Sequence, residues 1–133
     1  MNKKILLIGA SGGIGSCIYK TIRNNNNFIL KPTSKDLNLN YKINFASSLK
    51  FDALVYCAGI NNPTKFSETE YDDFNSSINI NVYGLIQLCK KVQFTNGANI
   101  IAIGSLYSFS SNYNRIHYIT SKHALLGAVK SLA

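Results

Sequence analysis

The sequence of 133 residues lacks several features that would point to particular classes of protein. No stretch approaches the roughly twenty apolar residues that a membrane-spanning helix needs, so we expect no membrane association. The first apolar run, residues 5–8, is too short for a secretion signal and leads directly into a glycine-rich loop. Internal repeats and low-complexity segments are also missing, apart from asparagines at 24–27. We therefore expect a soluble globular protein.

Cysteines and acidic residues are few. The three cysteines, Cys17, Cys57 and Cys89, lack metal-ligand spacing, so we expect buried free thiols in a reducing cytoplasm and no metal site. Six acidic residues oppose fourteen basic ones, and the resulting net charge of +8 would suit nucleic acid. The lysines are scattered, however, and not interleaved with aromatic residues. A basic surface that favours anionic cofactors, with no nucleic-acid partner, is the better interpretation.

The residues that are present predict one domain with a real core, since 46% are hydrophobic and 15% charged. The apolar runs predict strands at 5–8, 28–30, 37–39, 51–57 and 99–103, with at most a turn or two of helix before Phe51. Helical spacing predicts helices from the glycine loop to the asparagine run, over 71–94 and from about 114 to 133. Ser67-Glu-Thr-Glu70 resembles a capping box that opens the second helix. This alternation is typical of an α/β fold with a parallel sheet and right-handed crossovers.

The loop Gly9-Ala-Ser-Gly-Gly-Ile-Gly15 follows the first strand and opens the first helix. In that setting, glycines let the backbone approach a pyrophosphate, and the helix N-terminus supplies free N–H groups and a positive dipole. The glycine spacing differs from the commoner dinucleotide fingerprint, and a plain tight turn is the alternative.

A second motif lies near the end of the sequence, Tyr118-Ile-Thr-Ser-Lys122. Residues four apart share a helix face, so the phenol and the ammonium can point into one pocket. The nearby positive charge favours the phenolate, which suits proton transfer. Ser105 follows the strand expected at 99–103, at the edge where open α/β sheets bind ligands. In isolation, such a tyrosine usually packs and such a serine usually caps, but together they indicate an oxidoreductase site.

Taken together, these motifs resemble the short-chain dehydrogenase/reductase family. Gly9, Gly13 and Gly15 match the family's glycine motif, and Ser105, Tyr118 and Lys122 match its catalytic positions. Asn81-Val-Tyr-Gly84 resembles the helix motif with the catalytic asparagine. Tyr56-Cys-Ala-Gly59 stands where the family usually has Asn-Asn-Ala-Gly, and only Ala58 and Gly59 agree. The resemblance implies a Rossmann-like doubly wound parallel sheet, truncated after the helix with the tyrosine and lysine.

The resemblance also implies an activity, the NAD(P)-dependent interconversion of a small-molecule carbonyl and alcohol by hydride transfer. Tyr118 would be the general acid or base, and Ser105 would bind the substrate oxygen. Lys122 would hold the nicotinamide ribose, and Asn81 would support a water-linked proton path to it. The implied cofactor-binding residues are Gly9, Ser11, Gly13, Ile14, Gly15, Ser34, Lys35, Asn38, Leu39, Ala58, Gly59, Tyr118 and Lys122. His117 and His123 have no partner pattern and are assigned to structure or solvent.

The residues after the second strand bear on the choice of cofactor. No carboxylate occurs there until Asp36, whereas an acidic residue would be expected to bind the ribose of NAD. Lys35, preceded by Ser34, would neutralise a 2′-phosphate, so NADP(H) is favoured and NAD(H) is possible. The alternative is that Lys35 is merely solvated.

The sequence ends inside the last predicted helix, whereas family members are usually considerably longer. The resemblance therefore implies a single NAD(P)-binding domain, residues 1–133, incomplete at its C-terminus, with an unpaired edge on the strand at 99–103. Both a fragment and a natural truncation fit, and the alternative function is a non-catalytic or impaired nucleotide-binding fragment. The two long helices are apolar on more than one face, and Ala124, Gly127 and Ala128 permit close approach. By resemblance we expect a homodimer or homotetramer through these helices.

Overall fold

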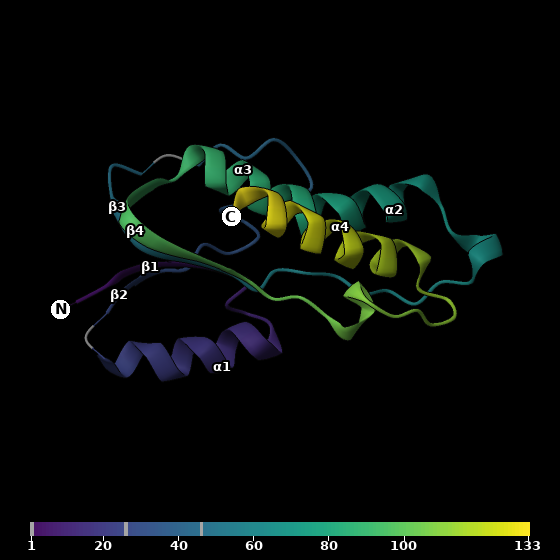
Figure 1. The fold of residues 1–133 in the computed structure, drawn as a ribbon, viewed down its shortest axis with the longest axis horizontal. Helices are drawn as coiled ribbons and strands as arrows, with labels where there is room; N and C mark the ends of the chain where they lie inside the picture. Colours follow the sequence, from purple (N-terminus) through teal and green to yellow (C-terminus); the bar gives the residue numbers. More distant parts are fainter. Residues whose placement is uncertain (1, 26, 46) are drawn as a thin grey trace.

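The described residues of the computed structural model, 2–25, 27–45 and 47–133, form a four-stranded parallel sheet with helices on both faces (Figure 1). The strands lie in the order β2-β1-β3-β4 and are β1 (Lys4–Ile8), β2 (Phe28–Leu30), β3 (Lys50–Tyr56) and β4 (Gln93–Ala102). The α-helices are α1 (Gly13–Ile22), α2 (Tyr71–Ile78), α3 (Gly84–Lys91) and α4 (Ile116–Leu132). Helix α1 covers one face, and α2, α3 and α4 lie on the other. The predicted α/β fold is confirmed.

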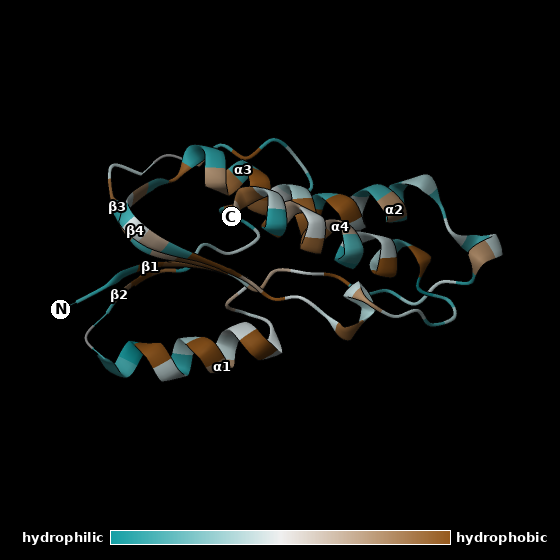
Figure 2. Ribbon diagram, in the orientation of Figure 1, coloured by the Kyte–Doolittle hydropathy of each residue, from teal (hydrophilic) through white to brown (hydrophobic). Residues whose placement is uncertain are grey.

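The central strand β1 is buried on both faces. Ile5 and Leu7 pack with Val55 in a cluster that α1 covers, whereas Leu6 and Ile8 point into the larger core on the side of α3 and α4. This explains why β1 is a continuous apolar run rather than an alternating one. Figure 2 shows the same pattern, with hydrophobic strands in the middle and mixed helices outside.

The connection between β2 and β3, residues 31–49, differs from the prediction. Its described residues lack the strand expected at 37–39. The Leu37 N–H donates to the Thr33 carbonyl (2.9 Å) in a single turn, which agrees with the expectation of at most a turn or two of helix before Phe51. Leu37 and Ile43 are nevertheless buried in the larger core. The side chain of Gln87 on α3 accepts a hydrogen bond from the Ile43 N–H (2.8 Å) and donates one to the Tyr41 carbonyl (3.1 Å). A side chain thus satisfies backbone groups that a neighbouring strand would otherwise have paired.

The single long helix expected over 71–94 is interrupted and ends early. A π-helical turn, η3 (Asn79–Tyr83), separates α2 from α3, and β4 already begins at Gln93. The predicted capping box is wrong, because Ser67 lies in a separate 3-10 turn, η2 (Phe66–Glu68), and Glu70 precedes α2 without a side-chain cap. The extended backbone of Thr69 and Glu70 separates the two elements.

Strand β4 is longer than expected and irregular. Phe51 pairs with Phe94 and Ala53 with Asn99, so residues 95–98 bulge out of the ladder around Gly97, whose φ is 74°. Among the described residues β4 pairs only with β3, and its Ile100 and Ile101 are 42% and 49% exposed. The expected unpaired edge is therefore present in the described part of the chain.

The end of the first helix agrees with the prediction. Helix α1 ends at Ile22 and continues as a 3-10 turn, η1 (Arg23–Asn25), into the asparagine run, whose residue 26 lies outside the described residues.

The expectation of three buried thiols is wrong. Cys17 is exposed, and Cys57 and Cys89 are half-buried. The sheet-facing side of α1 is formed by Ile18, Tyr19 and Ile22, which turns Cys17 toward solvent. Burial raises the pKa of the Cys57 and Cys89 thiols, which keeps them protonated.

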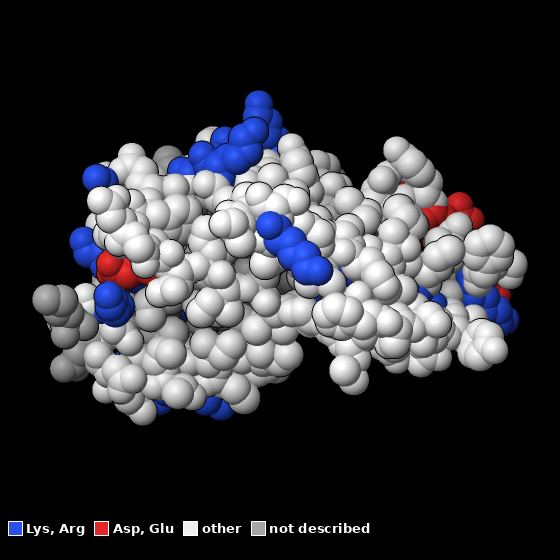
Figure 3. Space-filling view, in the orientation of Figure 1, with Lys and Arg blue, Asp and Glu red and all other residues white. Residues whose placement is uncertain are grey.

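The surface carries its basic side chains in separate places on the face shown in Figure 3. Within the described residues, no group of three His, Cys, Asp or Glu side chains is placed to hold a metal ion. None of the helices in this part of the chain is long and apolar enough to cross a membrane.

Candidate active site

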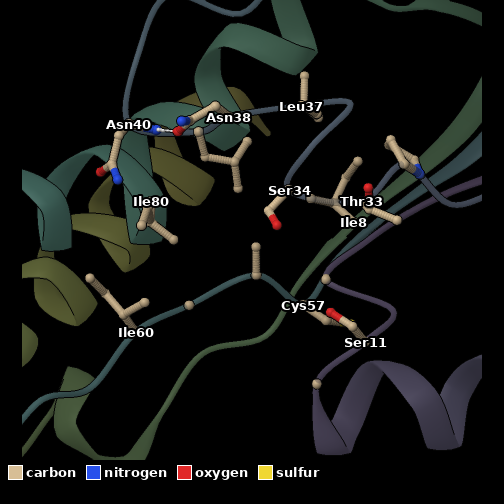
Figure 4. Close-up of a pocket in the computed structure, with 16 residues that line it drawn as sticks. Ile8, Ser11, Thr33, Ser34, Leu37, Asn38, Asn40, Cys57, Ile60 and Ile80 are labelled. Carbon is tan, nitrogen blue, oxygen red and sulfur yellow. Dashed lines mark hydrogen bonds between the residues drawn. The ribbon is translucent and has the colours of Figure 1, made fainter.

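A cavity of about 530 Å³ lies at the carboxyl ends of β1, β2 and β3 (Figure 4). Three connections build its wall: the glycine loop, the segment from Pro32 to Asn40, and the turn after β3. Seven of the predicted cofactor residues line it, namely Gly9, Ser11, Ser34, Asn38, Leu39, Ala58 and Gly59. Gly13, Ile14, Gly15, Lys35, Tyr118 and Lys122 are not among its lining residues.

The glycine loop packs closely against the neighbouring strand. Gly9 has a φ of 81°, and a Cβ added there would lie 2.6 Å from the Ala58 nitrogen. A Cβ on Gly15 would overlap the Gly9 carbonyl oxygen. Only glycines permit this tight turn, which explains the glycine requirement at both positions.

The start of α1 suits an anionic group. Its N-cap, Gly12, makes no side-chain cap hydrogen bond, and the first turn contains no acidic residue. Gly12, Gly13 and Ile14 are exposed, so this end of the helix is accessible from solvent. The free N–H groups and the helix dipole therefore fit the pyrophosphate of a dinucleotide.

Asn81 lies in the π-helical turn, and its side chain binds the turn after β3. It is fully buried, its Oδ1 accepts from the Ile60 N–H (2.8 Å), and its Nδ2 donates to the Ile60 carbonyl (3.0 Å). The Tyr56 hydroxyl donates to the Ile80 carbonyl at 2.5 Å, inside the same turn. Burial raises the pKa of Tyr56, which keeps this phenol protonated as a donor.

Lys122 lies between the end of β4 and the cavity wall. Its Nζ donates to the Ile103 carbonyl (2.9 Å) and lies 5.7 Å from the centre of the Tyr118 ring. A Cβ on Gly59, which lines the cavity, would be 3.8 Å from the same Nζ. Burial lowers the pKa of the Lys122 ammonium. The structure therefore brings Lys122, Tyr118 and the cavity wall together.

Ser105 and Tyr118 are connected through Tyr107, a residue that the sequence did not single out. The Ser105 Oγ accepts a hydrogen bond from the Tyr107 N–H (3.1 Å), which leaves the hydroxyl proton free for another acceptor. The Tyr107 ring meets the Tyr118 ring edge-on, with 6.0 Å between centroids, and its hydroxyl accepts from Asn112 (2.8 Å). Tyr107 is one of eight tyrosines, and no pattern distinguishes it in the sequence.

A parallel sheet with a glycine-rich turn and a polar cluster at its carboxyl edge defines the class of Rossmann-like nucleotide-binding folds. Residues 40–133 match the sequence model described as short chain dehydrogenase, and the chain belongs to this family.

Two curated relatives are reductases by name. The 3-oxoacyl-(acyl-carrier-protein) reductase FabG of Rickettsia bellii is 32% identical over 154 residues, covering 96% of this chain and 64% of that enzyme. Carbonyl reductase family member 4 of Xenopus tropicalis is 37% identical over 87 residues, covering 62% of this chain and 36% of its own length. The chain thus spans less than two thirds of the length of these relatives.

Solved structures with the same fold include 4-hydroxyisoleucine dehydrogenase complexed with NADH. It has a TM-score of 0.82 at 24% identity. The match covers 99% of this chain and 68% of the dehydrogenase chain. A short chain dehydrogenase family protein from Francisella tularensis has a TM-score of 0.87 at 21% identity. The match covers 100% of this chain and 63% of the Francisella protein. At these identities the similarity supports the fold alone.

Proposed function

We propose that the protein is a NAD(P)-dependent oxidoreductase that interconverts a carbonyl and an alcohol by hydride transfer. The observation that carries this proposal is the position of Lys122, whose ammonium lies over the Tyr118 ring and beside Gly59 of the cavity wall. One cation is thereby close both to a proton donor and to the cavity that fits a dinucleotide.

In this proposal the bound nicotinamide supplies the hydride and the chain's own residues handle the proton. Tyr118 donates its phenolic proton to the substrate oxygen during reduction and takes it back in the reverse direction. Ser105 donates its free hydroxyl proton to the same oxygen and so orients the carbonyl. Lys122 stabilises the phenolate that remains on Tyr118 and is placed to bind the ribose hydroxyls.

Asn81 has a more specific task than its motif suggested. Both N–H groups of its amide are engaged, one by the Ile60 carbonyl and one by the Ser121 hydroxyl (2.8 Å). We therefore assign to Asn81 the fixing of the turn after β3 against α4, and the water-linked proton path stays a prediction.

For the cofactor we propose NADP(H), with NAD(H) as the alternative. None of the described residues that line the cavity is acidic, so no carboxylate is presented to a ribose 2′-hydroxyl. Asp36 is the first acidic residue after β2. Its carboxylate accepts hydrogen bonds from the Thr33 N–H (2.9 Å) and the Thr33 hydroxyl (2.7 Å), which lowers its pKa. Ser34 lines the cavity, and the exposed Lys35 follows it.

The experiment that tests this function is an assay of the purified chain. NADPH or NADH is supplied with a panel of ketones, aldehydes and 3-oxoacyl thioesters, the last because one relative is named for that substrate. Tyr118→Phe should lower turnover by about a hundredfold or more, as expected for loss of a general acid, with little change in NADPH binding. Tyr113→Phe, at a tyrosine that is 91% exposed, is the matched control and should be silent. Turnover of Tyr118→Phe within about twofold of the unmutated chain would remove Tyr118 from the mechanism.

A further inference from the structure

Two buried polar contacts join α4 to the end of α2 and to the π-helical turn η3 that follows it. The Ser77 Oγ lies 2.9 Å from the His117 Nδ1, and the Asn81 Nδ2 donates to the Ser121 Oγ at 2.8 Å. All four side chains are at most 1% exposed. Ser77 and Asn81 are four residues apart, as are His117 and Ser121, so each pair shares a helix face. The contacts therefore form two successive rungs between the helices.

Each rung residue on α4 immediately precedes a residue of the proposed site. Tyr118 follows His117, and Lys122 follows Ser121. Successive side chains on a helix are about 100° apart, so fixing one fixes the direction of the next. The Ser121 hydroxyl also donates to the Tyr118 carbonyl (2.7 Å), which ties the second rung to the same turn.

The first turn of α4 is attached to α2 by the contact between Ser77 and His117. The N-cap residue, Arg115, makes no side-chain cap hydrogen bond to the helix, and Ile116 is 40% exposed. Arg115 instead donates to Asn61 (2.7 Å) at the surface. The contact between Ser77 and His117 is thus a buried, directional anchor of the turn from which Tyr118 projects.

The imidazole is an unusual choice if the site needs only packing. Its Nε2 is buried and has no hydrogen-bond partner among the described residues. Buried polar atoms are normally paired, and an apolar side chain would fill the same space without leaving one unpaired. The polar atom that does make a contact is Nδ1, and a hydrogen bond fixes rotation in a way that an apolar contact does not.

We propose that Ser77 and His117 form a positioning pair that sets the direction of the Tyr118 phenol; this rests on the proposed function of Tyr118. The pair touches neither substrate nor cofactor in this proposal. It acts by holding the start of α4 against the end of α2, so that the phenol points to the same place as Ser105 and Lys122.

The variants that test the pair separate the two ring nitrogens. His117→Asn keeps a polar atom near the position of Nδ1 and deletes Nε2, whereas His117→Gln does the reverse. Ser77→Ala removes the partner. We expect Ser77→Ala and His117→Gln to lower kcat by about tenfold or more, since small misplacements near reacting groups are costly, with the KM for NADPH within about twofold. His117→Asn should stay close to the unmutated protein, and the Ser77→Ala/His117→Gln double variant should be no worse than either single variant.

A second readout needs no turnover. The chain has two histidines, and the exposed His123 is an internal control for the nuclear magnetic resonance signals of isotope-labelled histidine. Ser77→Ala should move the Nδ1 signal of His117 and leave that of His123 in place. With labelled tyrosine, the Tyr118 ring signal is identified by its loss in Tyr118→Phe. It should move in Ser77→Ala and His117→Gln, but not in His117→Asn.

The outcomes separate this inference from the proposed function. A Tyr118 signal that moves as expected, in a chain without turnover, supports the positioning pair and counts against the proposed activity. An active chain whose kcat and Tyr118 signal are unchanged in Ser77→Ala overturns the positioning pair alone. The same holds if His117→Asn behaves like His117→Gln, because His117 then only fills space. Thermal unfolding checks each variant, and Ser77→Ala, the smallest change, decides if a His117 variant does not fold.

Discussion

Replacing Gly84 by alanine should destabilise the fold because the Tyr56 hydroxyl already occupies the place of the new methyl group. An added Cβ would overlap the Tyr56 Oη and would lie 3.2 Å from Leu39 Cδ2 and 3.3 Å from the Asn79 carbonyl oxygen. To make room, the phenol must move away from the Ile80 carbonyl, to which it now donates. The change therefore combines overpacking with the loss of a buried hydrogen bond.

The magnitude follows from these two effects. Overpacking of a core costs about 1–3 kcal/mol, and leaving the buried partners unpaired costs about 1–3 kcal/mol. Alanine regains about 0.5–1 kcal/mol because it is the better helix former. We expect a net loss of about 1–5 kcal/mol, a large part of the stability of a small domain.

Urea unfolding followed by far-ultraviolet circular dichroism measures this loss. Gly127→Ala is the matched control, since a Cβ there meets nothing within 4 Å, and it should stabilise α4 slightly. Tyr56→Phe/Gly84→Ala should be more stable than Gly84→Ala alone, because the phenylalanine no longer fills the space. If Gly84→Ala were as stable as Gly127→Ala, the close contact between Tyr56 and Gly84 would be refuted.

Three further predictions concern the cofactor, assembly and acid stability. Lys35→Ala should reduce the difference in binding free energy between NADPH and NADH by about 1.5–3 kcal/mol, because one contact with the 2′-phosphate is lost. Equal binding of both cofactors by the unmutated chain would contradict the NADP(H) assignment. Light scattering should show a dimer or tetramer, because α2 exposes Tyr71 and α4 exposes Ile116 and Leu132, and a clean monomer would oppose this. Hydrogen bonds from the Lys4 N–H and the Thr95 hydroxyl lower the pKa of the Asp52 carboxyl from 3.8. The ionised carboxylate therefore stabilises the folded state at neutral pH, and this stabilisation is lost as the pH falls below 3.8. In Asp52→Asn the melting temperature should decrease less on acidification than it does in the unmutated chain. An equal decrease in both proteins would exclude this carboxylate as its cause.

The sequence predicted those parts of the fold in which one pattern dominates. The continuous apolar run of β1 indicated a strand buried on both faces, and Gly9 and Gly15 stand where the backbone leaves no room for a Cβ. The connection at 31–49 escaped prediction because its backbone groups pair with the side chain of Gln87, a contact between distant residues. The π-helical turn escaped because its residues keep the apolar spacing of an ordinary helix.

For the candidate site, the resemblance to the family singled out Asn81, Ser105, Tyr118 and Lys122, and their functional roles stay predictions. Tyr107 connects two of these residues without any sequence signal, and the contact of His117 with Ser77 spans forty residues. Contacts of this kind depend on how the helices pack, and local patterns do not encode them.

The most direct test of the central claim is to follow the hydride itself. The purified chain is supplied with a carbonyl substrate from the panel and with NADPH that carries deuterium at the transferable position of the nicotinamide. We predict deuterium on the carbinol carbon of the alcohol product, and almost no product with Tyr118→Phe. An alcohol formed without the label, or no alcohol with any substrate of the panel, would contradict the account of this chain as a hydride-transferring oxidoreductase.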